Sequence, residues 1–253
     1  MNQRFASAVG RTRLYQLYNR AFGRFGHRTI AGFIHEYSRT RRDIFFIQVG
    51  ANDGITWDPL YFFIRRDRWR GVVIEPQHDV FETKLKATYR NVPGIQLMNV
   101  AVDSADGSRP LYKYSFTSSR WATGAASFDR KMLIDAFGTN YVQDNIRREH
   151  LSVSDDPDEY LTSEMVECVS FETSRGRLKR DVIDFLVTDV EGQDVAILNT
   201  FPFERIRPAN VVFELSHRDA AFNDFLTKLS AYGYDIFLSK GDAIALRRET
   251  GAA

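Results

Sequence analysis

Cysteine is almost absent from this chain of 253 residues. The single thiol, Cys168, cannot form a disulfide within the chain and leaves no cysteine pair to build a zinc site. Long apolar runs are also missing, since no stretch of about 18 apolar residues could span a membrane and the N-terminus lacks the apolar segment of a signal peptide. From these absences we expect a cytoplasmic protein in which Cys168 is a small buried hydrophobe.

Acidic residues are scarce in the first 42 positions, where nine arginines accompany a single acid, Glu36. This segment has a net charge of +8, although the whole chain has only +1. Apolar residues recur in it at helical spacing: Leu14, Tyr18, Phe22 and Phe25. We predict that residues 1–42 form a basic helical cap with arginines in solvent. The alternative is contact with a membrane surface or an anionic substrate; nucleic acid is not expected, because no DNA- or RNA-binding signature accompanies the charge.

The composition of the chain is 43% hydrophobic and 26% charged residues, as in an ordinary α/β protein with a sizeable core. We therefore expect one main domain, residues 43–253. Its most informative stretch is an apolar run, residues 45–49, that ends in the turn Gly50-Ala51-Asn52-Asp53-Gly54. A turn of such small residues lets a ligand approach bare main-chain N–H groups.

A second apolar strand, residues 71–75, follows after a crossover long enough to hold a helix, so the two strands should be parallel neighbours. Glu75 ends this second strand. An acid at that position of a βαβ unit commonly accepts hydrogen bonds from both ribose hydroxyls, so the ligand should contain a nucleoside. The fingerprint of dinucleotide-binding proteins would require glycine at 52 and a small residue at 55, where this chain has Asn52 and Ile55.

Strand and helix patterns continue to alternate along the chain, which predicts one doubly wound α/β sheet, mostly parallel and Rossmann-like, with helices on both faces and its site at the carboxyl ends of the strands. The further strands are predicted at 95–102, 182–189 and 210–214, and a closing C-terminal hairpin at 234–238 and 243–246. The main helices are predicted from 58, at 79–89 and at 218–232.

Four fragments in order resemble the FkbM family of S-adenosylmethionine-dependent methyltransferases: residues 49–54, Ile74-Glu75-Pro76, residues 99–102 and Asp189-Val190-Glu191-Gly192. The resemblance spans roughly residues 43–217. It implies the class I methyltransferase fold with S-adenosylmethionine as cofactor. The cofactor-binding residues that the loop, Glu75 and the resemblance together suggest are Gln48, Gly50, Ala51, Asn52, Asp53, Gly54, Glu75, Pro76, Asn99, Ala101, Val102 and Asp189.

Four titratable residues follow two neighbouring strands and should converge at the rim of the sheet: Asp189, Glu191, Glu214 and His217. Methyl transfer to an alcohol requires removal of the hydroxyl proton, either by a general base or after a metal has lowered its pKa. His217 is the natural base because histidine titrates near neutrality. Alternatively, Asp189 and Glu214 share a divalent cation, or they cap backbone amides.

Residues 104–165 form the least regular part of the sequence, rich in Ser, Thr, Asp and isolated aromatic residues. Long connections of this kind are usually functional or mobile. We interpret this insertion as a lid over the methyl acceptor.

The resemblance implies an S-adenosylmethionine-dependent O-methyltransferase acting on a hydroxyl of a sugar, glycan or natural product. The alternative from another class is a cofactor-binding or scaffold protein that retains the fold without the chemistry. A nicotinamide-dependent oxidoreductase is disfavoured by Asn52 and Ile55.

Overall fold

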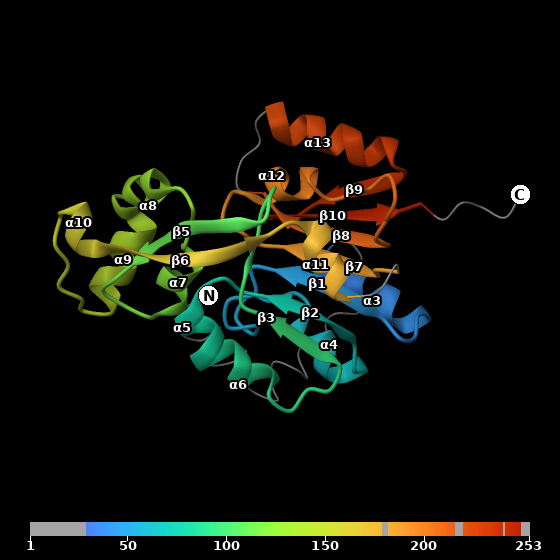
Figure 1. The fold of residues 1–253 in the computed structure, drawn as a ribbon, viewed down its shortest axis with the longest axis horizontal. Helices are drawn as coiled ribbons and strands as arrows, with labels where there is room; N and C mark the ends of the chain where they lie inside the picture. The colour runs from blue at the N-terminus through green and yellow to red at the C-terminus, as the bar shows by residue number, and fades with distance from the viewer. Residues whose placement is uncertain (1–28, 179–181, 216–219, 240, 249–253) are drawn as a thin grey trace, which may run out of the picture.

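A central sheet of seven strands organises the described part of the chain (Figure 1). The computed structural model describes residues 29–178, 182–215, 220–239 and 241–248. The strand order is β3-β2-β1-β7-β8-β10-β9. The neighbours from β3 to β8 pair in parallel, and β10 is antiparallel to both β8 and β9. The strands are β1 (Phe45–Val49), β2 (Arg70–Ile74), β3 (Ile95–Met98), β7 (Phe185–Thr188), β8 (Asn210–Glu214), β9 (Tyr234–Leu238) and β10 (Asp242–Arg247).

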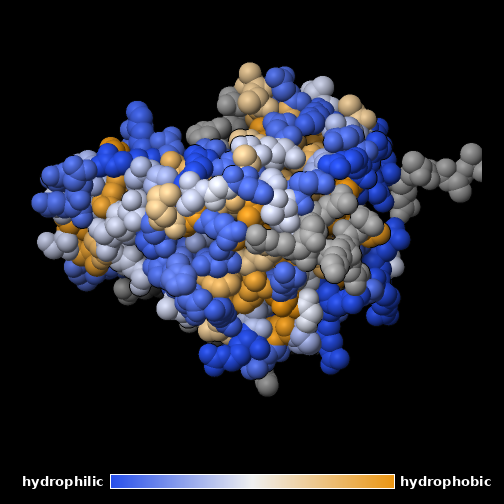
Figure 2. Space-filling model, in the orientation of Figure 1, coloured by the Kyte–Doolittle hydropathy of each residue, from blue (hydrophilic) through white to orange (hydrophobic). Residues whose placement is uncertain are grey.

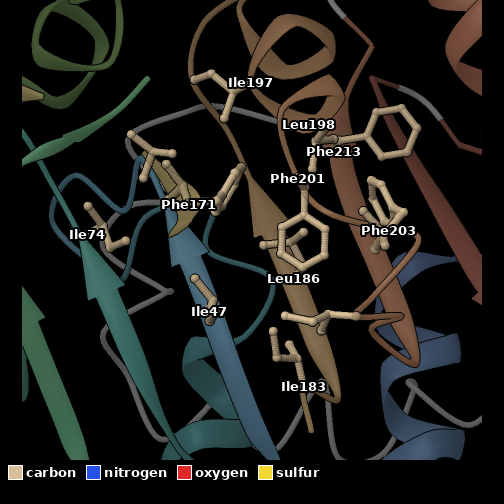
Figure 3. Packing of buried hydrophobic residues seen from close by; sticks show 14 of the residues in the cluster. Ile47, Ile74, Phe171, Ile183, Leu186, Ile197, Leu198, Phe201, Phe203 and Phe213 are labelled. Carbon is tan, nitrogen blue, oxygen red and sulfur yellow. The ribbon is translucent and has the colours of Figure 1, made fainter. Parts of the chain in front are cut away.

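Side chains alternate across this sheet and feed two separate hydrophobic clusters, one on each face. On one face, strand residues such as Ile47, Leu186 and Phe213 pack with side chains of the helices behind them, as Figure 3 shows. The helices of this face are α11 (Phe171–Leu178), α12 (Asp194–Asn199) and α13 (Ala220–Ala231). The other face, which includes Phe46 and Phe185, is covered by α3 (Ile30–Thr40), α4 (Tyr61–Asp67) and the helix over residues 78–89. The predicted doubly wound, mostly parallel fold is confirmed.

Several elements match the sequence predictions closely. Strand β8 has the predicted bounds, and β9 and β10 form the predicted antiparallel hairpin. The helix predicted at 79–89 is a continuous helical run of α5 (His78–Val80), the π-helical turn η1 (Phe81–Leu85) and α6 (Lys86–Tyr89). The helix predicted from 58 begins at Tyr61, and the Asp58 carboxylate accepts hydrogen bonds from the backbone N–H groups of Leu60 (2.7 Å) and Tyr61 (2.9 Å).

The single strand predicted over residues 95–102 is wrong, because the chain changes sheets within it. Residues 95–98 form β3 of the central sheet, whereas β4 (Ala101–Val102) pairs with β6 (Leu161–Val169) in a second sheet. Asn99 marks the change of direction. Its side-chain amide donates to the carbonyl oxygens of Glu75 (2.9 Å) and Pro76 (3.0 Å), which draws this part of the chain toward the end of β2.

Residues 104–165, the least regular part of the sequence, contain more regular structure than the strand at 111–116 and the short helix at 127–137 that their sequence suggests. They hold β5 (Gly107–Tyr114), the first residues of β6, and four short helices, α7 (Arg120–Gly124), α8 (Arg130–Phe137), α9 (Asn140–Arg148) and α10 (Pro157–Tyr160). We call residues 104–165 the lobe; its helices and the far ends of β5 and β6 extend to the left of the central sheet in Figure 1.

The lobe has a small hydrophobic core of its own. Tyr114, Leu133, Val142 and Tyr160 are buried in it, and the ring of Tyr160 stacks on that of Phe137 with centroids 3.9 Å apart. Figure 2 shows mainly hydrophilic residues over the lobe, in agreement with apolar side chains that point inward. None of its helices is longer than nine residues.

The described end of the predicted N-terminal cap is α3, which packs on the sheet. Ile30 and Ile34 are buried, and the Tyr37 hydroxyl donates a 2.5 Å hydrogen bond to the Asp184 carboxylate at the amino end of β7. The remainder of the predicted cap, residues 1–28, lies outside the described residues. Within the described ranges, no helix combines the length and the apolar character needed to cross a membrane.

A substitution at Gly71 would test how tightly the sheet is packed. A Cβ at this position would lie 2.4 Å from the carbonyl oxygen of Phe46, a backbone atom that cannot move aside. Gly71→Ala should therefore lower the free energy of unfolding by about 1–3 kcal/mol, measured by denaturant titration. Gly107→Ala is the matched control, because nothing lies within 4 Å of its added Cβ. Equal stabilities of the two variants would contradict this description of the packing.

Candidate active site

A pocket opens at the edge of the sheet where the parallel strands end. It encloses about 640 Å³ of empty space, part of it open to solvent. The loops that follow β1, β2, β3 and β7 line one side, and residues of the lobe line the other. The carboxyl ends of parallel strands meet at this edge, so residues far apart in the sequence are brought together here.

The loop after β1 is folded tightly against the ends of its neighbours. Gly50 has a positive φ of 80°, and a Cβ there would lie 1.9 Å from the carbonyl oxygen of Asp189, so only glycine fits. The backbone N–H groups of Gly50 and Ala51 both donate to the carbonyl of Ile74, at 3.0 and 3.1 Å. The N–H of Gly54 donates to Ala51. The expectation that this loop presents bare N–H groups to a ligand is therefore wrong for Gly50, Ala51 and Gly54.

Glu75 is a buried acid that is hydrogen-bonded to this loop. One carboxylate oxygen accepts from the backbone N–H of Asn52 (2.7 Å), and the other accepts from the backbone and side-chain nitrogens of Gln77 (2.9 and 3.1 Å). Burial raises the pKa of Glu75, while these hydrogen bonds and the charge of Arg120 act in the opposite direction. Glu75 also lines the pocket.

The structure brings most of the predicted cofactor residues to the pocket wall. Those that line it are Gly50, Asn52, Glu75, Pro76, Ala101, Val102 and Asp189. The hydrogen bond from the backbone N–H of Asn52 to the Glu75 carboxylate joins two of these residues.

The other predicted cofactor residues are not among those that line the pocket. Ala51 is buried in the core, and a Cβ at Gly54 would meet the ring of Tyr89 at 2.7 Å. The Gln48 amide donates to Asp58 at 3.0 Å, and Asp53 accepts from the N–H groups of residues 55 and 56. Asn99 bonds the carbonyls that follow β2. These residues hold the loops in position.

Acidic side chains gather at the rim after β7 and β8. Burial raises the pKa of Glu191 to about 8, with further increases from the charges of Asp189 and Glu214. Burial together with Asp189 and Asp194 raises the pKa of Glu214 to about 7. Asp189 and Glu191 line the pocket. The fourth predicted residue, His217, lies outside the described residues.

Two further acids join this rim and were not among the sequence candidates. Asp194 is fully buried, and burial raises its pKa to about 6. Burial and the charge of Asp189 also raise the pKa of Asp242. Among the described residues, no three His, Cys, Asp or Glu side chains form a group that could hold a metal ion.

The lobe contributes a wall of the pocket. The sequence predicted this segment as a lid but singled out none of its residues as lining the site. Arg120, Thr123 and Gly124 of α7 line the pocket. The hydroxyl of Thr123 accepts from the side-chain amide of Asn52 at 3.2 Å, and its carbonyl accepts from the side chain of Gln77 at 2.9 Å. The predicted lid thus contacts both the loop after β1 and the residues after β2. No periodicity or motif singled out α7 in the sequence, because it is only five residues long.

The sequence from residue 48 to residue 236 matches the model of the methyltransferase FkbM domain, which covers more than half of the chain. The chain belongs to the FkbM methyltransferase family. This confirms the family resemblance seen at the strand ends. Comparison with curated proteins gave no match.

Solved structures similar to this FkbM methyltransferase include two bacterial methyltransferases. A methyltransferase FkbM from Methylobacillus flagellatus is 13% identical with a TM-score of 0.47, and the match covers 97% of this chain but only 58% of that one. An O-methyltransferase from Bacillus cereus, solved with S-adenosylhomocysteine, is 8% identical with a TM-score of 0.44 and coverage of 97% and 96%. This chain is therefore considerably shorter than its Methylobacillus relative.

The raised pKa of Glu191 predicts how the stability of this protein depends on pH. Between the ordinary value of 4.5 and about 8, folded Glu191 keeps a proton that the unfolded chain has released. The contribution of this group to stability therefore falls as the pH rises through that window. Glu191→Gln, neutral at every pH, should raise the free energy of unfolding at pH 8 by about 1 kcal/mol or more and change it much less at pH 5.

Urea unfolding of both proteins at the two pH values measures this difference. Glu159→Gln, an exposed acid of the lobe, is the matched control and should give the same small change at both. A Glu191→Gln effect that does not grow from pH 5 to pH 8 would contradict the burial of this carboxyl.

Proposed function

We propose that this methyltransferase transfers the methyl group of S-adenosylmethionine to a hydroxyl oxygen of a sugar, glycan or natural product. One observation carries the proposal. A single pocket contains an acid at the end of β2, Glu75, and a second acid on the opposite rim, Glu191, whose pKa of about 8 suits proton removal near neutral pH. The first is placed to hold a nucleoside, and the second to activate an acceptor.

The residues of the pocket fit the proposed cofactor. Ala101, Val102 and Ile197 provide an apolar wall for adenine, and Glu75 lies where the ribose hydroxyls could donate to it. The guanidinium of Arg120 has a buried Nε without a hydrogen-bond partner, which leaves a donor for an anionic group. When bound, the cofactor supplies a methyl group on a sulfonium, which is already an excellent leaving group.

The protein must then align the acceptor and remove its proton. Glu191 is the base that the geometry favours, because it lines the pocket whereas Glu214 is not among the lining residues. Its neighbours Asp189 and Glu214 raise its affinity for a proton, and Arg120 opposes them. A carboxylate with a pKa of about 8 is a far stronger base than an ordinary glutamate, and a useful fraction is still ionised at neutral pH.

The lobe is the natural place for acceptor recognition. Several of its residues line the pocket, and Tyr141 of α9 has an exposed ring. Partial burial raises the pKa of the Tyr141 hydroxyl, and the charges of Arg120 and Glu191 have smaller, opposite effects on it. An exposed aromatic ring beside polar groups suits a hydroxylated, partly apolar acceptor such as a sugar ring. We infer that residues 104–165 act as the acceptor-binding lid.

Methyl transfer is tested by incubating the protein with S-adenosylmethionine labelled in the methyl group and a panel of sugars, oligosaccharides and hydroxylated natural products. We expect label in a product that survives mild base, since methyl ethers are stable there and methyl esters are not. The rate should rise as the pH passes about 8, where Glu191 loses its proton. Glu191→Gln should lower the rate by about a hundredfold.

The control for this test is binding, since Glu191→Gln should still bind S-adenosylhomocysteine and unfold no more easily than the wild type. Label found only in base-labile products would contradict O-methylation of hydroxyls. An unchanged rate in Glu191→Gln would remove this residue as the base.

Cofactor binding gives a separate prediction for Glu75. Glu75→Gln keeps the size of the side chain. It replaces one carboxylate oxygen, which now accepts from an N–H donor of Asn52 or Gln77, with an amide N–H₂ group. It also removes the negative charge offered to the ribose hydroxyls. The affinity for S-adenosylhomocysteine should fall by about 1.5–3 kcal/mol, the range for hydrogen bonds to charged groups, measured by calorimetry. Glu82→Gln, which affects only an exposed pair with Lys86, is the control. Equal affinity of Glu75→Gln and wild type would exclude Glu75 as the ribose ligand.

A further inference from the structure

Arg120 is a cation without a matching anion in the described structure. It opens the short helix α7 of the lobe, and its side chain lines the pocket. A guanidinium has five N–H donors arranged in a fixed fork. The Nε of Arg120 is buried without a hydrogen-bond partner, and the side chain makes no ion pair within 4.0 Å with any described carboxylate. Burying part of a charged group with its donors unmet is costly, so its position calls for an anionic partner.

The pocket around Arg120 is built to leave its guanidinium in place. Gly124 follows one helical turn later, and a Cβ there would lie 2.0 Å from Arg120 Nη1 and 3.6 Å from Glu191 Oε1. In this arrangement the guanidinium occupies the space that a side chain at residue 124 would take. Thr123 holds α7 from the other side through its bonds with Asn52 and Gln77. The arginine is thus positioned by contacts with the same loops that form the nucleoside half of the pocket.

The guanidinium lies between the part of the pocket that contains Glu75 and the rim that contains Asp189 and Glu191. Its charge opposes the rise in pKa that burial causes at Glu75 on one side and at Asp189 and Glu191 on the other. It is the one cationic side chain among the described residues that line the pocket. An anion bound here would lie beyond the ribose and next to the rim acids.

We propose that Arg120 binds the α-carboxylate in the amino-acid part of the cofactor, an inference that rests on the proposed function. S-Adenosylmethionine consists of a nucleoside and an amino acid, and the nucleoside half is accounted for by Glu75 and the apolar wall. The remaining anionic group is a carboxylate, whose two oxygens match the guanidinium fork. Arg120 is therefore a cofactor-binding residue contributed by the lobe, and the lobe completes the cofactor site as well as covering the acceptor.

The test compares two ligands that differ only in this charge, S-adenosylhomocysteine and its carboxamide, by calorimetry on the full chain. Wild-type protein should bind the acid about tenfold or more tightly than the amide, as expected for a charge-assisted hydrogen bond. Arg120→Gln should bind both with similar affinity, so the preference disappears while the affinity for the amide changes less than about threefold. Arg130→Gln is the matched control, because Arg130 belongs to the same lobe but pairs with the exposed Asp158, and it should keep the full preference.

Several outcomes would overturn the inference. If Arg120→Gln still prefers the acid as strongly as the wild type does, another group binds the carboxylate. If Arg120→Gln does not fold, the wild-type comparison still decides, since equal affinity for acid and amide would exclude a carboxylate partner. Arg120→Lys, which keeps the charge but loses the fork, should retain a weaker preference for the acid. If wild-type protein binds neither ligand, the proposed function fails as well, whereas equal binding of both refutes only the role of Arg120.

Discussion

The buried carboxylate of Glu75 is the interaction on which the rest of the pocket depends. Its two oxygens accept from Asn52 in the loop after β1 and from Gln77 in the segment after β2. Those two residues in turn donate to Thr123 of the lobe. A buried carboxylate requires such partners because its desolvation is otherwise too costly. One buried side chain therefore links three segments separated by up to 71 residues.

A second constraint is the balance of charge at the rim. Burial raises the pKa of Asp189, Glu191, Asp194, Glu214 and Asp242, and the charges of neighbouring acids raise it further for all of them except Asp189. Arg120 supplies the opposing charge from the lobe. Such an arrangement weakens the folded state as these acids ionise, and it also produces a carboxylate of unusual basicity in the pocket. The same burial and repulsion thus account for a cost in stability and for the basicity on which the proposed proton removal rests.

The sequence by itself determined the architecture of the sheet and the family. Buried strands such as residues 45–49 and 210–214 are continuous apolar runs, and small-residue turns or acids at their ends mark the carboxyl edge, so local pattern is sufficient to place them. Glu75, Asp189 and Glu191 could be predicted as pocket residues for the same reason, because parallel strands bring their ends to one edge whatever their separation in the chain. The fragments around them were enough to indicate an FkbM methyltransferase, which the family match confirms.

Only the tertiary structure decided what the loops do. The N–H groups of Gly50 and Ala51 bond to Ile74 instead of standing free, and residues 95–102 divide between two sheets because Asn99 bonds back to the end of β2. The lobe is ordered by packing among short helices, and α7 has only five residues, so neither this helix nor Arg120 was visible in the sequence. Some side chains of the site are far apart in the sequence but meet in the fold. Their contacts, and the burial that shifts pKa values, cannot be read from a local sequence pattern. The sequence therefore specified which edge of the sheet bears the site, and the fold selected the residues that form it.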